Sequence, residues 1–136
     1  MKSNQFDLCV EAVILGISID EISKTVAITL RQAQTTNVLT LVAENVSRFL
    51  VNEFREQNII DRITVWDSQS EVEEFRVCLS YLLGGANRQT DMPSQIKHAI
   101  DDELKAIHDG EKILVEIEPV FGAAICFTAQ SLRLQD

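Results

Sequence analysis

The sequence predicts an α+β protein, with helices in the N-terminal part and a small, mainly antiparallel sheet of about three strands that includes a C-terminal hairpin. Two observations support this prediction. Apolar residues recur at helical spacing over most of residues 5–57, and they alternate with polar residues over residues 61–67 and 112–118. Residues 123–134 are apolar at first and alternate later. Short alternating segments rich in β-branched residues are typical of strands.

Three helices are expected before the first strand. The first covers residues 5–15 and ends at Gly16. The second begins at a capping box formed by Ser18 and Glu21. The third covers residues 39–57 and has the most regular apolar stripe, as expected for a helix that packs one face on a core. The members of this stripe are Leu39, Val42, Val46, Phe49, Leu50 and Phe54.

The second half is expected to contain three strands and two helices. The first of these helices begins at Ser68 or Ser70 and ends at Gly84 and Gly85, because serine commonly caps the start of a helix and glycine its end. A polar loop, the second helix and the hairpin follow. The first strand, the loop, the second helix and the two hairpin strands occupy residues 61–67, 86–92, 93–110, 112–118 and 123–134, with a turn at 119–122.

The composition is that of a globular protein, and we expect a single domain spanning residues 1–136, since domains commonly hold roughly 100–200 residues. Hydrophobic residues form 46% of the chain and charged residues 24%, which argues against disorder. The apolar stretch at residues 8–19 is interrupted by Glu11 and Gly16, so it does not resemble a signal peptide or a membrane span. We therefore expect a cytoplasmic protein that does not contact a membrane.

The sequence contains no motif that assigns a cofactor or a catalytic mechanism. It lacks the glycine-rich loops of nucleotide-binding proteins and the nucleophile elbow of hydrolases. His98 and His108 lie ten residues apart on one expected helix, too far apart to share a metal ion. Cys9, Cys78 and Cys126 each have apolar neighbours, as expected for buried reduced thiols. We expect no cofactor, no metal ion and no enzymatic activity.

Acidic residues outnumber basic ones, mostly in the second half. The chain has 21 acids, 12 bases and a net charge of −9, and residues 61–136 hold 14 of the acids and 7 of the bases. Nucleic acid is bound through lysine and arginine, so direct nucleic-acid binding is not expected. Carboxylates cluster around Glu71 and around Asp102. These clusters either stabilise and solvate the helices that contain them or contact a basic partner.

Small size, acidity and missing motifs together favour a binding protein. We expect an immunity protein or inhibitor that neutralises a basic, nuclease-like bacterial toxin by occluding its surface, because a protein that cleaves a polyanion is itself basic where it binds. Two alternatives stay open: an effector-secretion chaperone or phage DNA mimic, and an enzyme whose site has no sequence motif. The oligomeric state also stays open. The expected partner-binding residues are Asp67, Glu71, Glu74, Asp101, Asp102 and Glu103.

Overall fold

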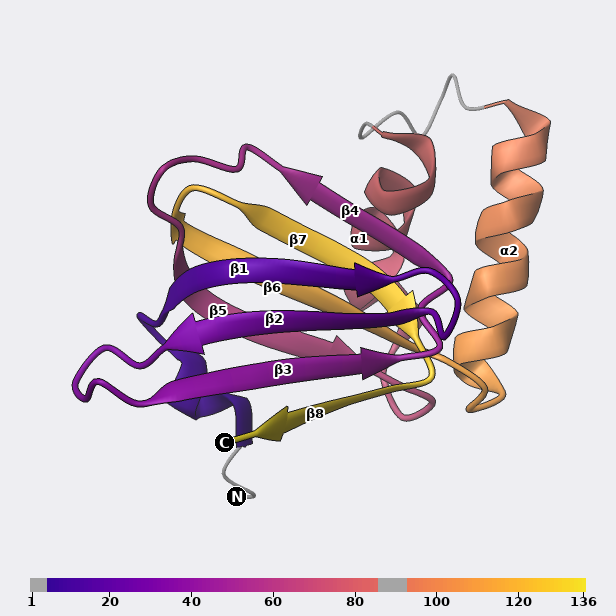
Figure 1. Ribbon diagram of the computed structural model, residues 1–136. Coiled ribbons are helices and arrows are strands. Elements are labelled where there is room, and N and C mark those ends of the chain that lie inside the picture. The colour runs from indigo at the N-terminus through magenta and orange to yellow at the C-terminus, as the bar shows by residue number, and fades with distance from the viewer. Residues whose placement is uncertain (1–4, 86–92) are drawn as a thin grey trace.

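Strands dominate the fold. The computed structural model describes residues 5–85 and 93–136, and within them the chain forms one eight-stranded antiparallel sheet and two α-helices (Figure 1). A short 3-10 helix, η1 (Gln5–Cys9), precedes the sheet. The loop expected at residues 86–92 lies outside the described residues. The expectation of a sheet of about three strands is therefore wrong.

The strands lie in the order β4-β7-β6-β5-β1-β2-β3-β8, so β4 and β8 are the edges of the sheet. Both helices fall between β5 and β6 in the chain. The helices are α1 (Val72–Gly84) and α2 (Ser94–His108). The strands are β1 (Val13–Asp20), β2 (Thr25–Arg31), β3 (Val38–Glu44), β4 (Arg48–Asn52), β5 (Ile59–Trp66), β6 (Ile113–Phe121), β7 (Ala124–Ala129) and β8 (Ser131–Gln135).

The expected N-terminal helices are wrong, because residues 13–52 contain β1 to β4. Strand β2 shows the physical reason. Val26, Ile28 and Leu30 are buried, and the residues between them are half-exposed. Apolar residues four positions apart, such as Val26 and Leu30, satisfy both the helical and the strand period. The intervening Ile28 and the many β-branched residues of this segment favour the strand.

The capping box expected at Ser18 and Glu21 is wrong, because Ser18 lies in β1 and Glu21 lies in the turn of the β1–β2 hairpin. The Asp20 carboxylate accepts hydrogen bonds from the backbone N–H groups of Ile22 and Ser23, at 3.0 and 3.2 Å. Lys24 has a φ of 58°, in the left-handed region, and β2 then returns antiparallel to β1. An aspartate that bonds the backbone two residues later is typical of a turn, so the chain reverses here and no helix begins.

The sheet bends so that its two ends form facing layers. Figure 1 shows β1, β2, β3 and β8 in one layer, with β4, β6 and β7 behind it. The β3–β4 and β7–β8 connections lie at the same end of the sheet. There the Gln130 N–H donates to the Glu44 carbonyl at 2.9 Å, and the Ser47 N–H donates to the Thr128 carbonyl at 3.0 Å. Buried apolar side chains from both layers form one core between them.

The two helices cover the outer face of the second layer and make a second core there. This core contains Phe75 and Leu79 of α1 and Ile107 of α2, and Leu114 of β6 and Cys126 of β7 face it from the sheet. Both helices and the antiparallel pairing of β6 with β7 agree with the sequence prediction. The second expected hairpin strand is divided, since its last part is β8 and pairs with β3. Neither helix of the described ranges is long and apolar enough to cross a membrane.

Candidate functional site

A groove with a volume of about 460 Å³ lies between α1 and the outer face of the second layer. Glu74, Cys78 and Tyr81 line it from α1, because residues at i, i+4 and i+7 share one face of a helix. Glu116 and Glu118 line it from β6, where residues two apart share one face of the sheet. The groove thus brings three carboxylates together with two aromatic rings, those of Trp66 and Tyr81, and two thiols, those of Cys78 and Cys126.

The two carboxylates of β6 have opposite pKa shifts. Arg62 on the neighbouring strand β5 donates to Glu118 Oε2 from Nε and lies at 3.0 Å from it through Nη2. Burial raises the pKa of Glu116, and a hydrogen bond to Glu118 raises it further. That hydrogen bond, together with Arg62, lowers the pKa of Glu118. Glu116 therefore keeps its proton to higher pH and donates it to the Glu118 carboxylate, while Arg62 balances the charge of Glu118.

Two of the three cysteines line the groove and contact each other. The Sγ atoms of Cys78 on α1 and Cys126 on β7 are 2.9 Å apart, and both residues are buried. The contact with Cys126, burial and the nearby Glu116 all raise the pKa of the Cys78 thiol. Burial raises the pKa of Cys9, which lies elsewhere in the core, to about 11. A thiol with a raised pKa is a poor nucleophile, so these surroundings do not activate Cys78 or Cys9 for catalysis.

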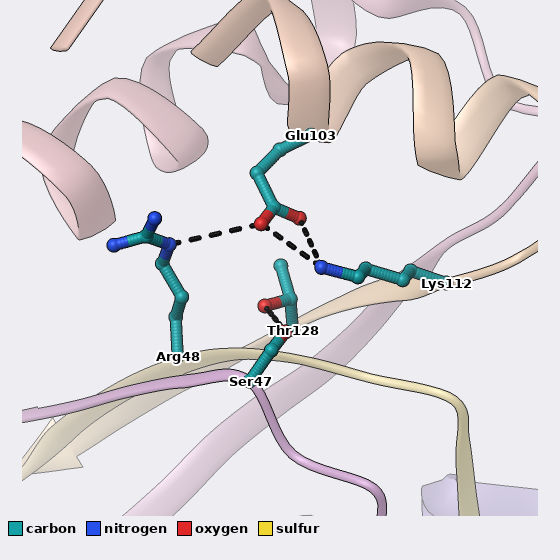
Figure 2. A network of polar contacts seen from close by, with 5 residues as sticks. All are labelled: Ser47, Arg48, Glu103, Lys112 and Thr128. Carbon is teal, nitrogen blue, oxygen red and sulfur yellow. Dashed lines mark hydrogen bonds and ion pairs between the residues drawn. The ribbon is translucent and has the colours of Figure 1, made fainter. Parts of the chain in front are cut away.

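A second polar cluster ties α2 to the sheet (Figure 2). Lys112 Nζ donates to both carboxylate oxygens of Glu103, at 3.0 and 3.2 Å, and Arg48 Nε lies 3.7 Å from Oε1. Below them the hydroxyl groups of Ser47 and Thr128 are 2.8 Å apart. Glu103 is only 7% exposed, so its negative charge is balanced by two bases of the same chain. The cluster is a structural brace and leaves no carboxylate available for a partner.

The structure separates the six expected partner-binding residues. Asp67, Glu71, Glu74, Asp101 and Asp102 are exposed, on α1, on α2 and just before α1. Glu103 differs, because it is buried and paired in the brace. Its position was visible in the sequence, since it follows the apolar residues Ile96 and Ile100 by seven and three positions and so shares their helical face. We therefore remove Glu103 from the contact surface.

Sequence reasoning missed the groove residues of the sheet. In the sequence, Glu116 and Glu118 are only polar positions of the alternating strand expected at residues 112–118, and Trp66 is near the end of the strand expected at residues 61–67. Their proximity to α1 depends on how the sheet stacks beneath the helix, which no local pattern encodes. Two carboxylates at i and i+2 opposite an arginine would be a signal only if the register of β5 with β6 were known. In the structure Arg62 and Glu118 are register partners.

Neither the metal-ligating residues of the described ranges nor the comparisons with known proteins indicate a further kind of site. His98 and His108 are exposed on α2, and the described residues contain no group of three or more His, Cys, Asp or Glu side chains that could hold a metal ion. No protein-family model, curated protein or solved structure matches the chain. What the protein does must therefore be inferred from the charges and contacts of its own surface.

Proposed function

We propose that this protein is a small acidic binding protein that neutralises a basic protein partner by covering its surface. The contact surface in this proposal comprises α1, α2 and the segment before α1, and we call it the acidic helical surface. Its contributing residues are Asp67, Glu71, Glu74, Asp101 and Asp102. The observation that supports the proposal most directly is that these exposed carboxylates lack a basic partner within 4.0 Å among the described residues.

The distribution of bases explains why the charge stays uncompensated. Described residues between positions 67 and 111 include nine acids and three bases. The bases that form ion pairs in the described structure lie outside both helices, and they are Arg48, Arg55, Arg62, Lys112 and Arg133. Uncompensated charge of one sign attracts a partner of the opposite sign, which accelerates encounter and selects among partners.

A nuclease-like toxin is the partner class that this charge fits best. A protein that cleaves nucleic acid presents lysine and arginine to the phosphate backbone, and an acidic inhibitor competes for that surface. In this proposal the protein is an immunity protein of the bacterial cytoplasm. A secretion chaperone or a phage DNA mimic would use the same electrostatic principle, and the activity of the captured partner distinguishes them from an immunity protein.

The test uses the partner isolated from the native host with the tagged protein. We expect a stoichiometric complex with a basic protein, whose association slows and loses salt dependence in the double variant Glu71→Lys and Asp102→Lys. The matched control is Asp7→Lys with Glu56→Lys, which makes the same change in charge at exposed residues outside the acidic helical surface. A neutral or acidic partner, or equal slowing by both double variants, would reject the proposal.

A further inference from the structure

We infer that the groove between α1 and the sheet binds an organic cation, specifically an alkylguanidinium or alkylammonium group. The groove is lined by carboxylates, aromatic rings and short apolar side chains. This site goes beyond the proposed function, because it assigns a pocket and a ligand class that hold whether or not a basic protein is the partner. The cation is either the side chain of a lysine or arginine in a macromolecule or a free amine.

The charge of the groove favours a cation. Glu74, Glu116 and Glu118 line it, and no basic side chain does so in the part of the chain that the structure describes. Arg62, which lies outside the lining, forms its ion pair with Glu118. Glu74 and Glu116 therefore have no basic side chain within 4.0 Å among the described residues.

Glu116 supplies the second reason. The residue is half-buried, so ionisation is costly, and its pKa is accordingly raised by burial and by the hydrogen bond to Glu118. The charge of Arg62 already favours the carboxylate form of Glu116, and a cation in the groove would favour that form further.

The size and the walls of the groove fit the rest of such a ligand. Its volume of about 460 Å³ lies within the range of roughly 300–1,000 Å³ that is common for ligand pockets. Leu50 and Val77 provide apolar walls for an alkyl stem, and Trp66 and Tyr81 offer rings for cation–π contact. Asn52 of β4 donates a hydrogen bond to the Tyr81 hydroxyl group, which orients that ring.

Trp66 is the sole tryptophan of the chain and lines the groove, so its fluorescence reports ligand binding directly. We would titrate the protein with butylguanidinium and, in parallel, with butylurea, which has nearly the same shape but no charge. We expect a saturable change in Trp66 emission with butylguanidinium and none with butylurea. Equal saturation with both compounds, or none with butylguanidinium, would overturn the inference.

Two neutral variants separate local recognition from the general attraction of an acidic protein. Glu116→Gln should weaken butylguanidinium binding by about tenfold, because a hydrogen bond to a charged group typically contributes about that factor. Asp101→Asn removes the same charge from an exposed position of α2 outside the groove lining and should leave the affinity unchanged. Equal weakening by both variants would overturn the inference. Should Glu116→Gln fail to fold, Glu74→Gln on the exposed side of the groove gives the same comparison.

The source of the cation is resolved by two further ligands. Agmatine represents a free amine, and acetyl-glycyl-arginyl-glycine amide represents an arginine side chain of a polypeptide. Binding of both supports the inference with a macromolecular side chain as the source, and binding of agmatine alone supports it with a small molecule as the source. The inference is independent of the proposed function, because the variant Glu71→Lys with Asp102→Lys keeps every groove carboxylate and should still bind butylguanidinium.

Discussion

Glu116 and Glu118 show how two identical side chains on one strand acquire different acidities. Both face the outer side of β6, but Arg62 pairs with Glu118, whereas burial acts most strongly on Glu116. The difference arises from the neighbours of each carboxylate and not from the residue type. A strand that alternates regularly in sequence can therefore hold two glutamates, two positions apart, whose pKa values are shifted in opposite directions.

The raised pKa of Glu116 makes stability depend on pH. The folded state holds this proton to higher pH than the unfolded state, so the Glu116 contribution to the free energy of unfolding falls as the pH rises above about 4.3, the ordinary value for glutamate. Glu118 has a lowered pKa, and its contribution is lost only as the pH falls through that lower value.

The variant Glu116→Gln should remove the first effect. We compare the urea midpoint of the variant with that of the unchanged protein. The difference, variant minus unchanged protein, should be larger at pH 7 than at pH 4, because glutamine stays neutral throughout and its amide still donates to Glu118. Equilibrium unfolding in urea at both pH values measures this difference. A difference that does not change with pH would show that Glu116 ionises normally in the folded protein.

Gly122 is required at the β6–β7 turn for two separable reasons. Its φ of 86° lies in the left-handed region, and an added Cβ would collide with Asn58 Oδ1. Asn58 is 2% exposed and joins this turn to the β4–β5 connection, since its Oδ1 accepts hydrogen bonds from the N–H groups of Arg55 and Ala123, at 3.0 and 2.8 Å. Gly110 has a similar φ of 80° but nothing within 4 Å of an added Cβ.

Replacing each glycine by alanine should separate the two reasons. Gly110→Ala should cost about 1–2 kcal/mol of the free energy of unfolding, the usual cost of the left-handed conformation. Gly122→Ala should cost clearly more, because the backbone cost adds to the collision with Asn58. Denaturant unfolding of both variants checks this, and equal losses would mean that the turn yields without disturbing Asn58.

At the scale of elements, the sequence predicts correctly those helices whose apolar residues fit the helical period alone. The helices α1 and α2 were predicted because their apolar stripes are bounded by serine or proline and by glycine. The region of β1 to β4 was misassigned because valine, isoleucine and leucine residues fit both periods there. The groove could not be predicted at all, since it forms between a helix and strands that are distant in the chain.

The brace around Glu103 predicts how α2 is held against the sheet. Glu103→Gln should lower the free energy of unfolding by about 1–3 kcal/mol, because it leaves Lys112 and Arg48 without their shared carboxylate. Asp102→Asn, the preceding and exposed residue of α2, should change stability by less than about 0.5 kcal/mol. Urea unfolding of both variants measures the difference. Similar small losses would show that the ion pairs contribute little and that apolar packing alone fixes α2.

At the scale of the whole molecule, the chain has a net charge of −9, and the carboxylates of its described residues fall into two groups, those that form ion pairs and those that do not. The bases of the sheet and its connections balance several carboxylates locally, as Arg133 does for Glu44 at 3.5 Å. The exposed carboxylates of the acidic helical surface have no such balance among the described residues. High salt should therefore weaken attraction to a basic partner while leaving the fold intact, because the cores are apolar.

The most direct test of the proposed neutralising role is a titration of the captured basic partner with the purified protein while nuclease activity is followed. The proposal predicts that activity falls linearly and ends at one equivalent of protein per partner, and that the variant Glu71→Lys with Asp102→Lys needs a clear excess. A partner that keeps its nuclease activity at a large excess of the unchanged protein, or that has none to lose, would contradict the neutralising role.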